Sequence, residues 1–181
     1  STRYTSDEVI RSDEERLTVA LLASELLRGA PDAMAAIRVD WVPLAFIGRH
    51  EPRWASEDDG VSLSEARHAP GKLAEAWSEM YDEAGINKGA VAVHVAEIFE
   101  MLRQLVDGAS WALRRASAHA LVELAELGLL QSRYADDAAA LAALLRSRKW
   151  RDKEATLPKL DEAFPPSSGA AASAVRIVDA A

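Results

Sequence analysis

The stretch "SWALRRASAHALVELAELG", residues 110–128, decides the fold class of this chain. Its apolar residues recur every three or four positions, which is the spacing of one face of an α-helix. Gly128 follows the last of them, and glycine is a typical residue for ending a helix. Trp111 stands at the start of the run and is followed by two arginines. The pattern predicts an amphipathic helix that begins at an aromatic residue and carries no visible catalytic motif.

Apolar residues recur with the same spacing along most of the chain, and glycine or proline residues separate the periodic runs. No segment keeps for long the alternation of apolar and polar residues that a half-buried strand requires. The sequence therefore predicts an all-α fold. The expected helices lie at about residues 12–29, 32–38, 41–51, 72–82, 91–105, 111–127, 135–146 and 152–164.

Several residues are expected to define helix starts. Ser12 and Glu15 match a capping box, in which the hydroxyl and the carboxylate each accept a backbone N–H near the helix start. Asp40 is expected to cap the helix that follows it, with Pro43 in the first turn, where a missing N–H costs little. Residues 51–71 carry two prolines, two glycines and mixed charge, and we predict a long surface loop there.

Composition limits the class of protein. The 181 residues include 49% hydrophobic and 28% charged residues, which is typical of a globular chain. The net charge of −8 argues against a nucleic-acid partner bound through bulk charge. The absence of cysteine excludes a disulfide scaffold and a thiolate metal site.

The distribution of apolar residues bears on location. Apolar runs are too short to span a bilayer, so no membrane insertion is expected, and the polar N-terminal stretch does not match a secretory signal. We expect a cytoplasmic location, with the nucleus as the alternative. The first residue is Ser, and the tail reads "SSGAAASAVRIVDAA", so we expect a section of a longer protein.

A repeat appears when the sequence is shifted so that Trp111 falls on Trp150. Residues 105–125 then align with residues 144–164, and each copy contains a helix end, a polar turn, a Trp, basic residues and an amphipathic helix. A period of about 40 residues with two helices per unit is typical of HEAT and armadillo solenoids. Stacked helix pairs share a core that one pair cannot bury alone.

The repeat assigns structural roles to its polar turn. Trp111 is expected to close the core at the turn, provided that its indole N–H finds an acceptor. Arg114 stands about where HEAT units commonly carry an arginine that binds an aspartate in the turn. Asp107 is the candidate partner.

The sequence contains no recognisable catalytic, zinc-binding or nucleotide-binding motif. The four histidines do not form an H-E-x-x-H zinc motif, and His119 and Glu123 are spaced four apart on one helix face, where a packed histidine is the ordinary interpretation. The chain has no nucleophile elbow, P-loop or dinucleotide-binding motif. We therefore expect no catalytic residues, no metal and no cofactor; an α-helical enzyme is the least favoured class.

The segment "RSRKWRDK", residues 146–153, is the one basic cluster in this acidic chain. It has two interpretations. Basic residues favour a helix C-terminus, so the cluster could be a solvated turn between helices. Alternatively, Arg148, Lys149 and Arg151 are candidate contacts for an acidic partner surface, in which case binding would depend on salt.

Several stretches occur in the order and spacing seen in one known family. The segments "WVPLAFIGRHEP" (41–52), "KLAEAWSEMYDEAG" (72–85), "DGASWALRRASAHALVELAE" (107–126) and "LLRSRKWRDKEATL" (144–157) together resemble the C-terminal part of the proteasome adaptor and scaffold family, which are very large HEAT-repeat proteins. The resemblance covers about residues 40–160. The family's R-x-W-x-x-K-E unit is matched here by Arg148, Trp150, Lys153 and Glu154.

The resemblance implies a non-catalytic protein that binds the 26S proteasome, bridges its core and regulatory particles, and acts in quality control. The helical pattern and the repeat predict one α-solenoid segment over residues 1–181: a helical pair at 1–50, a loop at 51–71, HEAT-like units at 72–164 and a tail at 165–181. Residues 53–69 differ from the family as an insertion. The alternative is a HEAT or armadillo scaffold of another assembly, such as a phosphatase, transport or cytoskeletal complex.

Pro158 is a second departure, because it falls inside the last expected helix, where proline costs about 3 kcal/mol. We expect either a helix that starts near Thr156 as its cap, or a kinked helix.

Overall fold

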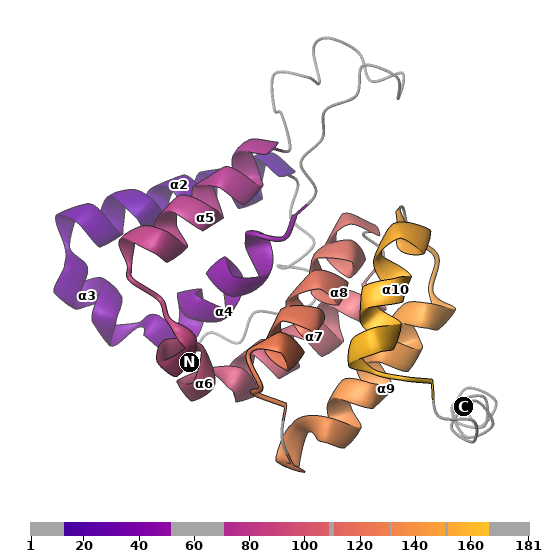
Figure 1. Ribbon diagram of the computed structural model, residues 1–181. Coiled ribbons are helices and arrows are strands. Elements are labelled where there is room, and N and C mark those ends of the chain that lie inside the picture. Colours follow the sequence, from indigo (N-terminus) through magenta and orange to yellow (C-terminus); the bar gives the residue numbers. More distant parts are fainter. Residues whose placement is uncertain (1–12, 52–70, 109–110, 131, 151, 167–181) are drawn as a thin grey trace, which may run out of the picture.

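The computed structural model describes residues 13–51, 71–108, 111–130, 132–150 and 152–166, and all regular structure in these ranges is helical (Figure 1). The prediction of an all-α chain is confirmed for this part. The helices are α2 (Asp13–Gly29), α3 (Pro31–Ala36), α4 (Arg38–Gly48), α5 (Gly71–Glu83), α6 (Lys88–Val93), α7 (Val95–Asp107), α8 (Trp111–Glu126), a 3₁₀ turn (Ser132–Tyr134), α9 (Ala135–Ser147) and α10 (Lys153–Ala163).

Helix α4 lies at the centre of the arrangement. It packs on α5 on one side and on α7 and α8 on the other, while α2 lies along α5 (Figure 1). Beyond α4, helix α7 contacts α8 and α9, and α8 packs along α10. The two groups of helices therefore meet around α4, and the end of α4 points into their junction.

One continuous core joins these helices. Each fully buried apolar side chain contributes about 1.5–3 kcal/mol relative to its exposed state. The spacing of three and four residues that predicted the helices also places the buried apolar residues on one face of each helix. The largest of them are Phe46, Met80, Ile98, Phe99, Leu102, Leu121, Leu124, Leu145 and Leu160.

Helix ends follow the glycine signals closely. Helix α2 ends at Gly29, as predicted. Gly85 and Gly128 have φ angles of 61° and 67°, in the left-handed region that favours glycine, and they follow the ends of α5 and α8. The backbone N–H of Leu129 donates to the carbonyl of Leu124 at 3.0 Å, which closes the last turn of α8.

The start of α4 differs from the prediction. The helix begins at Arg38 with Ile37 as its N-cap, so Asp40 lies inside the first turn and is not the cap. The reason is local: α3 and α4 are joined through Ile37 alone, whose N–H donates to the carbonyl of Met34 at 3.3 Å. Pro43 is therefore inside the helix and not in its first turn. A proline there has no N–H to donate to the carbonyl of Val39.

The helix expected over residues 91–105 is two helices. His94 separates α6 from α7, with φ −108° and ψ 14°. Val91 and Val95 are both buried, at 0% and 3% exposure, so the apolar spacing continues across the break. Periodicity alone could not reveal a single non-helical residue that keeps the buried face in register.

Helix α10 begins at Lys153 and continues through Pro158 to Ala163. Thr156 is therefore not its cap. The residue before the helix, Asp152, has a φ of 56°, which is unusual for a residue other than glycine. The exposed position of Pro158 leaves the carbonyl that lacks its donor on the outer side of the helix.

Three expectations fall outside the described residues. They are the capping role of Ser12, the loop with its insertion, of which residues 52–70 are not described, and the tail beyond Pro166. Among the helices that are described, none is long and apolar enough to cross a membrane.

Candidate functional site

The turn between α9 and α10 contains most of the residues that the sequence singled out. Trp150 is buried, and its indole N–H donates to the carbonyl of Leu145 at 2.9 Å. Lys153 Nζ donates to the carbonyl of Arg148 at 3.0 Å and also to that of Arg146. The last carbonyls of a helix have no partner within the helix. Trp150 and Lys153 therefore cap the C-terminal end of α9.

Arg114 does not bind Asp107, contrary to the prediction. Its guanidinium donates to the carbonyls of Gly108 at 2.6 Å, Val106 at 3.2 Å and Lys149 at 3.0 Å. The planar guanidinium can serve several acceptors at once, and carbonyls at the end of α7 need donors. Arg114 therefore connects the turn after α7 with the turn after α9.

Asp107 accepts instead from Arg148, whose Nη2 lies 3.1 Å from Oδ1 of Asp107. Both side chains are largely exposed, at 43% and 66%, so this ion pair contributes less than about 1 kcal/mol. The ion pair is informative mainly because it joins the same two turns that Arg114 connects.

The remaining predicted residues are less engaged. The side chain of Lys149 is exposed and has no ion pair within the described ranges, and Glu154 is exposed on the first turn of α10. Arg151 lies outside the described residues, as does the side chain of Trp111. Of the three candidate partner contacts, Arg148 is thus partly used inside the fold, and Lys149 presents its charge to solvent.

A second cluster, which the sequence did not predict, joins α4, α8 and α10. We call it the polar network: Arg49, His50, His119, Glu123 and Thr156. Glu123 accepts from the guanidinium of Arg49 and lies 2.7 Å from Nε2 of His50. The rings of His50 and His119 are stacked, with centroids 6.2 Å apart. Nε2 of His119 lies 3.4 Å from the Thr156 hydroxyl.

Aromatic side chains hold the arginine of the network. The guanidinium carbon of Arg49 lies 4.1 Å from the ring centroid of Tyr81 and 5.2 Å from that of Phe46. A cation over an aromatic face is attracted by the ring's negative surface. Burial raises the pKa of the Tyr81 hydroxyl, so this ring stays neutral beneath the cation.

The electrostatics of the polar network favour one pattern of charge. Burial alone would raise the pKa of Glu123, but the hydrogen bond from His50 and the charge of Arg49 outweigh it and lower that pKa. Burial, together with the charges of Arg115, His50 and Lys159, lowers the pKa of His119 to about 4. At neutral pH the network therefore contains an ionised Glu123, a cationic Arg49 and a neutral His119.

This arrangement connects helices and offers little for a reaction. Thr156, the one hydroxyl beside an imidazole here, is 3% exposed and also donates to the carbonyl of Asp152 at 3.4 Å. A substrate could not reach it without opening the helix packing. Within the described ranges, no group of three or more His, Asp or Glu side chains is placed to hold a metal ion.

One signal in the sequence pointed toward the network. His119 and Glu123 are spaced four apart, so they share one face of a helix. The partners of Glu123, Arg49 and His50, lie 74 and 73 positions away from it in the chain. Neither spacing nor composition indicates such a pairing.

We expect acid to destabilise the fold through His119. The unfolded chain binds a proton there at the ordinary pKa of 6.5, whereas the folded chain does so at about 4. Between these values the unfolded state holds more protons, so the free energy of unfolding falls as the pH drops from 6.5 to 4. Because His119 is partly open to solvent, we expect a loss of about 2 kcal/mol in urea denaturation.

The variant His119→Gln tests this assignment. It should remove the part of the pH dependence between 6.5 and 4 that His119 causes. The loss caused by Glu123 should remain; it begins as the pH falls below 4.5, the ordinary pKa of this carboxyl, because its folded-state pKa is lowered. His94→Gln, which replaces a histidine outside the network, controls for the substitution itself. An unchanged slope in His119→Gln would show that another group causes the acid sensitivity.

The chain has no significant match among models of known protein families, curated proteins or solved structures.

Proposed function

We propose that this chain is a non-catalytic scaffold section of the proteasome adaptor kind, built from stacked helix pairs. The observation that carries the proposal is Arg114, whose guanidinium donates to carbonyls at the connection between α7 and α8 and at the connection between α9 and α10. An arginine that fixes one helix pair against the next is what a repeated array of pairs needs, because each unit is stable only through its neighbours.

The packing of the C-terminal helices supports the same proposal. Helix α7 contacts α9, and α8 contacts α10, so like helices of the two repeat copies lie against each other (Figure 1). The capping of α9 by Trp150 and Lys153 gives a physical reason for the R-x-W-x-x-K-E unit. The exposed apolar side chains of α2 support an interaction role, since such residues mark protein contacts when they cluster. They are Leu21, Leu22 and Leu26.

The specific partner is the 26S proteasome in this proposal, and its support is the family resemblance of the four ordered stretches. The alternative is a helical scaffold of another assembly. That alternative keeps the helix pairs and the turn contacts but does not require the "WVPLAFIGRHEP" segment, which contains two residues of the polar network, Arg49 and His50.

A direct capture experiment separates the two proposals. The immobilised chain would be incubated with purified 26S proteasome, and separately with isolated core and regulatory particles, with ATP present throughout. Retention of the 26S particle above a resin carrying an unrelated acidic helical protein supports the adaptor proposal. Failure to retain any of the three particles would leave only the scaffold of another assembly.

Within this proposal, the basic residues between α9 and α10 make a measurable contribution to proteasome capture. Replacing Arg148, Lys149 and Arg151 with alanine should lower proteasome capture about fivefold and reduce its salt dependence, because rim charges each contribute less than about 1 kcal/mol. Asp107→Ala is the matched control: it breaks the same Arg148 ion pair but leaves all the positive charge in place. Equal loss in both variants would assign the effect to the ion pair and not to partner contact.

A further inference from the structure

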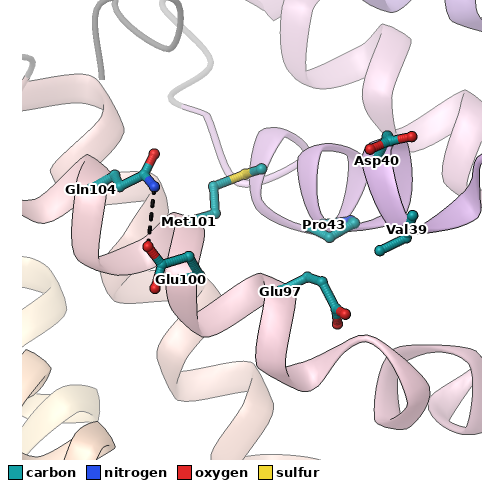
Figure 2. Close-up of a pocket in the computed structure, with 7 residues that line it drawn as sticks. All are labelled: Val39, Asp40, Pro43, Glu97, Glu100, Met101 and Gln104. Atoms are coloured by element: carbon teal, nitrogen blue, oxygen red, sulfur yellow. Dashed lines mark hydrogen bonds between the residues drawn. The ribbon is translucent and has the colours of Figure 1, made fainter. Parts of the chain in front are cut away.

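A groove runs between α4 and α7. The residues that line it belong neither to the polar network nor to the turn between α9 and α10. The volume of the groove is about 450 Å³. Figure 2 shows Val39 and Pro43 on the side of α4 that faces α7, with the side chain of Met101 extending toward them. The residues that line it are Val39, Asp40, Pro43, Glu97, Glu100, Met101 and Gln104.

One apolar residue of the groove, Val39, is open to solvent, whereas Met101 is half-buried and Pro43 is buried. Val39 is 46% exposed and lies on the side of α4 that faces α7 (Figure 2). Met101 adds a flexible, polarisable side chain of the kind found on surfaces that bind varied partners. A ligand that places an apolar side chain between Val39, Pro43 and Met101 would remove this surface from water.

The polar part of the groove consists almost entirely of acceptors. Oε2 of Glu97 is buried and has no hydrogen-bond partner among the described residues. A buried acceptor without a donor is unfavourable, and a ligand that supplies a donor would remove this penalty.

Glu100 has partners only at long distances, whereas Oε2 of Glu97 has none among the described residues. Arg103 lies 3.4 Å from Glu100, but it also binds Asp137 on α9 at the shorter distance of 2.6 Å. The amide of Gln104 reaches Glu100 only at 3.3 Å. Asp40 has no ion pair in the described part of the chain. The groove therefore keeps a net negative charge beside an exposed apolar surface.

We propose that this groove binds a segment of a partner protein in which a Lys or Arg stands beside an apolar side chain. The apolar side chain packs between Val39 and Met101, and the cation reaches Glu97 and Glu100. Both basic residues combine an apolar stem with a charged end, so one side chain can satisfy both parts of the groove. Charge complementarity excludes an acidic segment, which would place like charges together.

The choice of a protein segment as ligand rests on the proposed scaffold role. The test, however, needs no proteasome, so the two proposals fail separately. The ¹⁵N-labelled chain would be titrated with acetyl-Leu-Arg-Leu-Arg-amide and, in parallel, with acetyl-Leu-Gln-Leu-Gln-amide. We expect saturable amide shifts confined to residues 39–43 and 97–104 with the cationic peptide, and markedly weaker shifts with the neutral one.

Charge variants complete the experiment. Glu97→Gln with Glu100→Gln should lower the affinity for the cationic peptide about fivefold, and raising the salt from about 50 to about 300 mM should weaken binding in the unmodified chain. Glu126→Gln with Glu162→Gln removes the same charge from exposed sites on α8 and α10. Equal loss in this control, equal shifts with the neutral peptide, or no saturable shifts in the groove would each overturn the proposal.

Discussion

Gly48→Ala should lower the free energy of unfolding by about 3 kcal/mol, and with it the Tm by roughly 10 °C. A Cβ at this position would lie 2.3 Å from Cδ1 and 2.6 Å from Nε1 of Trp77. These distances are far below van der Waals contact. Trp77 is only 5% exposed, so its ring has no free space to move into. The better helix propensity of alanine, about 1 kcal/mol, offsets only part of this cost.

Two further variants make this prediction specific. Gly29 is also the last residue of a helix, yet no atom lies within 4 Å of the Cβ it would gain, so Gly29→Ala should be neutral or slightly stabilising. Trp77→Leu is itself destabilising, but it makes room at Gly48. The double variant should therefore be no less stable than Trp77→Leu alone in urea denaturation. A loss in Gly48→Ala that persists unchanged in the double variant would rule out the steric cause.

The close approach at Gly48 gives a physical reason for the segment "WVPLAFIGRHEP". Phe46 is buried in the core, Gly48 allows Trp77 to lie against the helix, and the next residue, Arg49, reaches Glu123. This short segment therefore joins both groups of helices. The sequence marked it as unusual without indicating why, since the contacts of Gly48 with Trp77 and of Arg49 with Glu123 involve residues far away in the chain.

The helices could be predicted because helix signals are local. The spacing of apolar residues, Gly29 and Gly128 define most of the boundaries without reference to tertiary structure. The same locality explains the errors. The break at His94 preserves the apolar spacing, and the position of Asp40 depends on how α3 turns into α4. Both are decided by a single residue's backbone angles, which composition does not determine.

The sequence predicted which residues take part in the candidate sites better than it predicted which groups they bind. A turn arginine was expected to find an acceptor, and Arg114 does, but the acceptors are carbonyls and not Asp107. An aspartate can be recognised in the sequence. Every residue has a backbone carbonyl, so the sequence does not show which carbonyl will accept a hydrogen bond. The polar network is a stronger case, because Arg49 and Glu123 are brought together only by the packing of α4 on α8.

Arg114→Ala should destabilise the chain by about 3 kcal/mol, because it leaves the carbonyls of Val106, Gly108 and Lys149 without their shared cationic donor. Hydrogen bonds to charged groups contribute about 1.5–3 kcal/mol, and these acceptors lie partly out of water. Arg115→Ala is the matched control. Its Nε lies 3.7 Å from Asp152 without a hydrogen bond, so its loss should cost less than about 1 kcal/mol.

The regions in which amide hydrogen exchange accelerates distinguish a local connection between the two turns from a general loss of packing. In Arg114→Ala, amide hydrogen exchange should accelerate most in the two turns that this arginine joins, around Gly108 and around Lys149, because opening there no longer breaks bonds to the guanidinium. Arg114→Lys should recover less than half of the lost stability, since an ammonium lacks the planar array of donors that serves three acceptors. Full recovery by lysine, or faster exchange spread evenly over all helices, would mean that charge or bulk, and not this three-way contact, holds the two turns together.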